Sequence, residues 1–277
     1  MNRLPKVVGI VNITEDSFSD GGLYYRPEAA IARCNELLRD GAQIIDLGPA
    51  ASHPDANPVP SAEEIRRLDP ILTALLPMKI PLSIDSFQPE TQVYAISRGV
   101  AFLNDIHGFP HAALYPQLAE AACKLIVMHS VHGLRPTTRV DVAPSQVWTG
   151  LLRFFEERLA RLEDFGIARS RIVIDPGMGF FLGGRPEASL RVLCGLRDIK
   201  RTFGLPVLLS VSRKSFLRTI TGRDLDSIAP ATLAAELFAS FAGVEYIRTH
   251  DARPLSDALR VFQAIEQYSH GIDPFTK

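Results

Sequence analysis

The sequence predicts an α/β fold with the architecture of a (β/α)8 TIM barrel, formed by a single domain over residues 1–277. Eight short apolar runs recur along the chain, and longer segments with helical spacing separate them. The residues are 46% hydrophobic, which is enough for one large core. We find no internal repeat, low-complexity tract or linker, so we expect no domain boundary. A doubly wound open sheet is the alternative architecture.

The eight runs have the composition of buried parallel strands, because they are apolar throughout instead of alternating with polar residues. In chain order they are residues 7–12, 43–48, 81–86, 101–105, 124–130, 171–177, 206–212 and 245–250.

The segments between the strands carry apolar faces at helical spacing. These faces span residues 30–38, 65–76, 148–162 and 255–265. The first helix has Pro27 near its start and Gly41 past its end, which are the usual positions for these residues. The second opens with Ser61 and Glu64, a capping-box pattern that predicts Ser61 as the cap.

Charge and cysteine content exclude several classes of partner. The net charge is −1 and the pI is near 6.7, so no basic field attracts nucleic acid or an anionic membrane. No apolar run is long enough to predict a membrane span, and we see no signal-peptide pattern near the N-terminus. Cys34, Cys123 and Cys194 are scattered and odd in number, which indicates reduced packing residues in a cytoplasmic protein.

Every predicted strand ends in a polar residue. An isolated polar residue in this position is commonly a helix cap or a turn residue. The carboxyl ends of barrel strands meet on one face, however, where barrel enzymes have their active sites. Polar residues at all eight ends therefore indicate a site. They are Asn12, Asp46, Asp85, Asn104 with Asp105, His129, Asp175, Ser212 to Lys214, and Arg248 with His250.

The acceptors among these residues suit a flat heterocycle rich in N–H groups. Such acceptors are supplied by Asp46, Asp85, Asn104 and Asp175.

The last two strands supply positive charge, in the quarter of the barrel where phosphate sites are common. The cations are Arg213, Lys214 and Arg248, with His250 beside them. Asn12 offers an amide oxygen to Mg²⁺, which takes few protein oxygens together with phosphate oxygens. A heterocyclic phosphate ester is therefore the expected substrate. Taken singly, Arg213 and Lys214 also fit solvated loop positions, and His250 fits a hydrogen-bonded residue at a strand end.

Seven segments, in this order, resemble dihydropteroate synthase: GIVNITEDSFSDGG, IIDLG, SIDSFQPET, FLNDIHGFP, DPGMGF, SVSRKSF and RTH. They extend from about residue 7 to residue 251. The resemblance implies a (β/α)8 barrel that joins 6-hydroxymethyl-7,8-dihydropterin pyrophosphate to p-aminobenzoate and releases pyrophosphate. It also implies Mg²⁺ as cofactor and a homodimer.

The resemblance assigns expected roles residue by residue. The pterin-binding residues are Asp85, Asn104, Asp175 and Lys214, and the catalytic residues are Asp85, Asp46 and Lys214. The pyrophosphate-binding residues are Asn12, Arg248, His250 and His53, and Asn12 also meets the metal. The p-aminobenzoate-binding residues are Ser212, Arg213, Phe180, Ser52 and Phe18.

Two segments depart from the family pattern. His53 stands where the family has arginine, and a neutral imidazole is a weaker phosphate partner than a guanidinium. The segment after DPGMGF is longer and carries Phe181. These departures are similar to those of the Sul-type, sulfonamide-insensitive branch of the family. Phe181 is therefore expected to clash with drugs that extend past the carboxylate end of p-aminobenzoate.

Two other functions remain open from the sequence. A pterin-dependent methyltransferase uses a similar barrel but needs no diphosphate site, so Ser212 to Lys214 and Arg248 to His250 disfavour it. A catalytically idle pterin-binding barrel is disfavoured by Asn12, Lys214 and His250.

Overall fold

Eight parallel strands form one sheet in the computed structural model, which describes residues 4–14, 25–51, 57–133, 140–272 and 274. The strands pair in the order β6-β5-β4-β3-β2-β1-β8-β7, and an isolated bridge between Ile174 and Val207 links the two ends of that order. The predicted (β/α)8 barrel is confirmed. The strands are β1 Lys6–Asn12, β2 Ile44–Gly48, β3 Leu82–Asp85, β4 Phe102–Asp105, β5 Lys124–Met128, β6 Ile172–Asp175, β7 Leu208–Leu209 and β8 Tyr246–Thr249.

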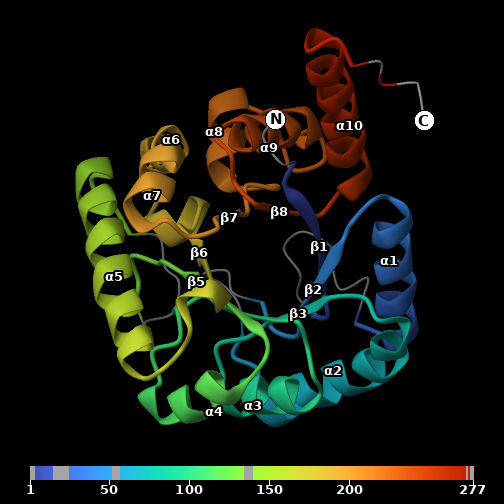
Figure 1. The fold of residues 1–277 in the computed structure, drawn as a ribbon, viewed down its shortest axis with the longest axis vertical. Helices are drawn as coiled ribbons and strands as arrows, with labels where there is room; N and C mark the ends of the chain where they lie inside the picture. Colours follow the sequence, from blue (N-terminus) through green and yellow to red (C-terminus); the bar gives the residue numbers. More distant parts are fainter. Residues whose placement is uncertain (1–3, 15–24, 52–56, 134–139, 273, 275–277) are drawn as a thin grey trace.

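The helices surround the strands in chain order, from α1 (blue) to α10 (red) (Figure 1). They are α1 Pro27–Arg39, α2 Ser61–Leu75, α3 Pro89–Ser97, α4 Tyr115–Glu120, α5 Pro144–Asp164, α6 Pro186–Cys194, α7 Leu196–Phe203, α8 Ser215–Thr221, α9 Ala229–Phe241 and α10 Ala252–Ser269. A short 3-10 helix, η4 Gly179–Leu182, lies between β6 and α6. None of the described helices has the length and apolar character that crossing a membrane requires.

An apolar layer fills the inside of the barrel. It is a separate cluster of buried side chains from seven strands: Val8, Ile44, Phe102, Ile126, Val173, Leu208 and Tyr246. The larger cluster packs between the strands and the helices. The inner layer forms the floor on which the residues nearer the strand ends are arranged.

The predicted site residues lie two positions after members of this inner layer. Asp46 follows Ile44, Asn104 follows Phe102, Asp175 follows Val173 and Arg248 follows Tyr246 by two residues, as Asp85 follows the buried Ser83. Alternate residues of a strand point to the same face. The polar groups therefore form the next layer of the barrel interior.

Two predicted boundaries differ in the structure. Strand β7 has only two residues instead of seven, because the chain then turns toward the barrel mouth, with Arg213 in the left-handed region at φ 59°. Ser61 is the first residue of α2 and not its cap, which is Pro60. Glu64 is buried and accepts a hydrogen bond of 2.5 Å from Ser86, so it cannot serve the capping box.

Candidate active site

Arg248 at the barrel mouth binds two carboxylates from other strands, and an amide binds one of these carboxylates. Its Nε lies 2.6 Å from Asp46 Oδ2, and another guanidinium nitrogen lies 2.8 Å from Asp85 Oδ2. Asn104 Nδ2 is 3.4 Å from the same Asp46 oxygen. The Asp46 side chain is 1% exposed, that of Arg248 13% and that of Asp85 17%. The closed barrel thus brings together residues from β2, β3, β4 and β8.

Two acceptors in this cluster have no hydrogen-bond partner among the described residues. They are Asp46 Oδ1 and Asn104 Oδ1, and both are buried. An unpaired buried acceptor is costly, so this arrangement is completed by a ligand or water that donates N–H or O–H groups. An N–H-rich heterocycle has the matching chemistry.

Burial perturbs the ionisation of the groups around the cluster. It raises the pKa of Asp85 to about 7, against the opposing effect of Arg248, and it raises the pKa of Asp175 to about 6. Burial also lowers the pKa of Lys214 to about 8, with Arg248 adding to the effect. Three groups near neutral pKa at one mouth are typical of a site that binds or moves charge.

Ser212 and His250 form a second group beside the acceptor cluster. Ser212 Oγ lies 2.9 Å from His250 Nδ1 and accepts a hydrogen bond of 3.2 Å from the His250 backbone N–H. Burial and then Arg213 lower the pKa of His250 well below its usual value, so its imidazole is neutral at pH 7. Arg213 is 3.2 Å from Asp251. The surroundings of His250 favour a bound anion, because Arg213, Arg248 and Lys214 all lie near it.

Phe180 and Phe181 are held in place by the segment that follows β5. Both lie in η4, where Phe181 O accepts a hydrogen bond of 2.9 Å from Val131 N and Phe180 O lies 2.9 Å from His132 Nε2. Lys214 Nζ lies 5.1 Å from the centre of the Phe181 ring. The Phe181 ring therefore lies beside Lys214, and Phe180 precedes it in η4.

Asn12 ends β1 opposite Gly48 of β2. A Cβ atom at Gly48 would lie 3.3 Å from Asn12 Oδ1, so the glycine leaves space for this amide. No three His, Cys, Asp or Glu side chains gather to hold a metal within the part of the chain that the structure describes. An amide oxygen at the mouth fits Mg²⁺ if substrate phosphate oxygens complete its coordination.

Two polar strand ends do not face the site. Asp105 points away from Asn104 and accepts hydrogen bonds from Gln92 Nε2 at 2.9 Å and from His107 N at 2.7 Å. His129 is buried, with Nδ1 3.3 Å from Pro176 O, and burial lowers its pKa to about 4. Both residues stabilise loops at the mouth.

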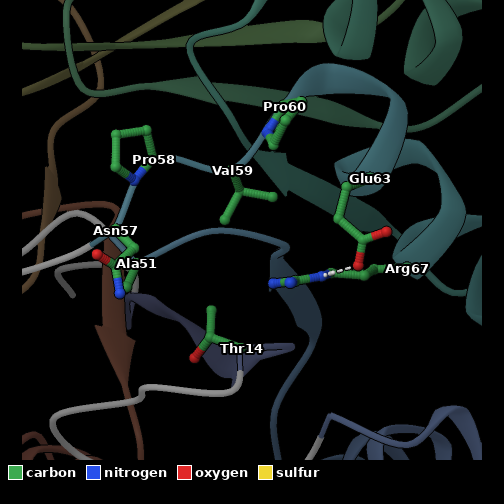
Figure 2. A pocket seen from close by; sticks show the side chains of 8 residues that line it. All are labelled: Thr14, Ala51, Asn57, Pro58, Val59, Pro60, Glu63 and Arg67. Carbon is green, nitrogen blue, oxygen red and sulfur yellow. Dashed lines mark hydrogen bonds and ion pairs between the residues drawn. The ribbon is translucent and has the colours of Figure 1, made fainter.

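Three predicted site residues, Phe18, Ser52 and His53, lie outside the described residues. Two further residues, Glu63 and Arg67, were not among the site residues predicted from the sequence. Both line a cavity of about 200 Å³ between α2 and the ends of β1 and β2, as Figure 2 shows. The sequence carries no signal for this placement, because charged residues on the first turns of a helix are usually solvated.

Comparison with known proteins gives one consistent family. The family model described as pterin binding enzyme matches residues 8–250. The dihydropteroate synthase type-2 of Escherichia coli is 54% identical over 267 residues, which cover 96% of this chain and 98% of that protein. The type-3 enzyme of Escherichia coli is 49% identical over 95% of this chain and 100% of that protein.

A solved structure has the same fold. Xanthomonas albilineans dihydropteroate synthase with 4-aminobenzoic acid superposes with a TM-score of 0.85 at 34% identity, covering 95% of this chain and 93% of that one. The family match, the curated relatives and the barrel agree. The chain belongs to the pterin-binding enzyme family and, within it, to the dihydropteroate synthases.

Proposed function

We propose that this enzyme joins 6-hydroxymethyl-7,8-dihydropterin pyrophosphate to p-aminobenzoate and releases pyrophosphate. We also propose that sulfonamides do not inhibit it. The observation that carries the pterin assignment is the buried cluster of Asp46, Asp85 and Asn104 with two unpartnered acceptor oxygens. The pterin ring presents N–H groups to these oxygens and to Asp175, and Lys214 donates to a ring acceptor.

The diphosphate group of the substrate lies toward Asn12 and His250 in this proposal. His250 is neutral in the free protein because of burial and three nearby arginines. A bound diphosphate would favour its protonation, so His250 donates to the departing oxygens. Asn12 would hold Mg²⁺, and the ion would supply further neutralisation of the leaving group.

Asp85 serves the chemical step. Departure of pyrophosphate leaves positive charge on the dihydropterin methylene group, and the adjacent carboxylate stabilises that charge. Arg248 holds Asp85 and Asp46 in position through its two ion pairs. Its expected contact with pyrophosphate requires the guanidinium to exchange one of these carboxylates for a phosphate oxygen. The aromatic amine of p-aminobenzoate then attacks the methylene carbon, and its nitrogen releases one proton to solvent as the new C–N bond forms.

The second substrate lies between Ser212 and Phe180, with its carboxylate toward Arg213. Phe181 follows Phe180 in η4, and its ring centre lies 5.1 Å from Lys214 Nζ. A sulfonamide carries substituents beyond the position of the substrate carboxylate, so an added aromatic ring there penalises the drug more than the smaller substrate. This difference in affinity is the proposed basis of insensitivity.

Aminobenzoate-dependent release of pyrophosphate, measured with and without Mg²⁺ and with and without a sulfonamide, tests this function. We expect turnover that needs Mg²⁺ and persists with the drug. Inhibition at low drug concentration would remove the insensitivity and keep the synthase. Pterin binding without turnover would favour an idle barrel.

We expect Phe181→Ala to lower the sulfonamide concentration for half inhibition by at least about tenfold, because the steric penalty is removed. The KM for p-aminobenzoate should change less. Phe180→Ala is the matched control, since that ring is proposed to contact the substrate and its loss should raise the KM for p-aminobenzoate. A Phe181→Ala enzyme that stays fully resistant would exclude Phe181 as the determinant.

We also propose that the enzyme is a homodimer that buries the exposed apolar face of α9 and α10. Phe241 packs edge-on against Phe262, with ring centres 4.6 Å apart, yet remains 52% exposed. Ile265 and Tyr268 on α10 are 58% and 75% exposed. Apolar surface of this kind marks protein contacts. Sedimentation should give twice the 30.5 kDa chain mass, and Phe241→Glu should give the single mass.

A further inference from the structure

We propose that Arg67 is a positioning residue for the diphosphate site, because it bridges the ends of β1 and β2 and thereby fixes Asn12. This inference rests on the proposed role of Asn12 in binding the diphosphate. Within the described part of the chain, Arg67 binds strand-end carbonyl groups and Glu63.

One guanidinium nitrogen of Arg67 binds both strand ends. Its Nη1 donates to Pro49 O at 2.9 Å and to Ile13 O at 3.3 Å. Ile13 directly follows the last residue of β1, and Pro49 directly follows the last residue of β2. The Arg67 side chain is only 9% exposed, so water does not readily replace it at these carbonyl groups.

These two carbonyl groups come directly after the strand pair that contains Asn12. Asn12 is opposite Gly48 in the register, and Ile13 N donates to Gly48 O at 2.8 Å. The ladder between β1 and β2 ends at this bond. Arg67 adds the next link beyond it, so the backbone on both sides of Asn12 is held against β2.

Glu63 holds the guanidinium in this position. Arg67 Nε donates to Glu63 Oε1 at 2.8 Å, and the guanidinium lies 5.0 Å from the centre of the Tyr25 ring. Figure 2 shows Glu63 and Arg67 together on one wall of the cavity, with Thr14 across from them. Hydrogen bonds from Arg66 and then from Arg67 lower the pKa of Glu63 to about 2, so it stays anionic.

The neighbouring Arg66 is a matched comparison within the same helix. It also binds Glu63, with Nε 2.6 Å from Oε2, but its side chain is 65% exposed. Its other hydrogen bonds to described residues go to Glu63 Oε1 and the Tyr25 hydroxyl, and none of these reaches a strand-end carbonyl. An effect of charge or of Glu63 alone would therefore be common to both arginines, whereas positioning of Asn12 belongs to Arg67.

A double-mutant cycle tests the inference with the full chain: Arg67→Met, Asn12→Ala and the double variant. We expect Arg67→Met to raise the KM for the dihydropterin diphosphate and the half-saturating Mg²⁺ concentration by about tenfold each, with a smaller change in the KM for p-aminobenzoate. Arg66→Met should leave all three values unchanged. The double variant should have the same KM for the dihydropterin diphosphate as Asn12→Ala, because both changes remove the same interaction.

Thermal unfolding of each variant separates folding from positioning. If Arg67→Met does not fold, Arg67→Lys replaces it, since an ammonium keeps the charge but cannot bind both carbonyl groups and Glu63 in one plane. Effects that multiply in the double variant, or an unchanged KM for the diphosphate substrate, would overturn the inference. An Asn12→Ala enzyme with unchanged KM would refute the proposed role of Asn12. If Arg67→Met still raised that KM, Arg67 would affect binding through a group other than Asn12, and this result would also overturn the inference.

Discussion

The Asp85→Asn variant is expected to lower kcat by about a hundredfold and to change the KM for the dihydropterin substrate by much less. The asparagine keeps the shape and one acceptor oxygen for the pterin ring. It removes the negative charge that stabilises the cation formed when pyrophosphate leaves. Steady-state kinetics on both substrates measure the separation of kcat from KM.

The same variant should change the pH profile. Burial raises the pKa of Asp85 to about 7, so in the free enzyme the carboxylate form increases as the pH rises through that value. The wild-type kcat/KM should therefore fall below neutral pH, and the Asp85→Asn profile should lack that fall. Asp69→Asn is a suitable control, because Asp69 is an exposed carboxylate bound to Tyr94 and Arg98 on the outside of the barrel.

A raised KM with an unchanged kcat in Asp85→Asn would assign this residue to binding alone. A profile that still falls below neutral pH would assign the titration to another group.

Replacing Arg248 by Met should lower the free energy of unfolding by about 3–5 kcal/mol near neutral pH, because it leaves two buried carboxylates without their partner. Asp46 is 1% exposed and Asp85 17%, so water compensates little. Without the guanidinium, the folded-state pKa of Asp85 rises further above its unfolded value, because the opposing effect of Arg248 is removed. Stability relative to wild type is then retained in acid and is lost as the pH rises from about 7 toward that raised value.

Denaturant unfolding of wild type and Arg248→Met between about pH 5 and pH 8 measures this loss. Adding Asp46→Asn to Arg248→Met should recover part of it, because one of the two opposed charges is removed. Equal stability of Arg248→Met and wild type at the upper pH would mean that the ion pairs contribute nothing to folding.

The sequence alone determined the barrel and the type of chemistry at its mouth. The eight apolar runs and the polar residue at the end of each are local patterns that span five to seven residues. The structure then shows that Asp46, Asn104 and Asp175 lie two positions after an inner apolar residue, which strand periodicity places on the same face. The family segments are likewise local, so they too could be identified without coordinates.

The contacts between the polar strand-end residues, and the ionisation state of each, follow from the tertiary structure and not from the sequence pattern. Arg248 binds Asp46 from 202 positions away and Asp85 from 163, distances over which no sequence period carries information. Asp105 and His129 have the same residue types as site members, yet Asp105 binds Gln92 of α3 and His129 binds the carbonyl group of Pro176. Arg67 acquires its position only when α2 packs beside β1 and β2. Contacts and burial of this kind depend on closure of the barrel, whereas residue periodicity does not.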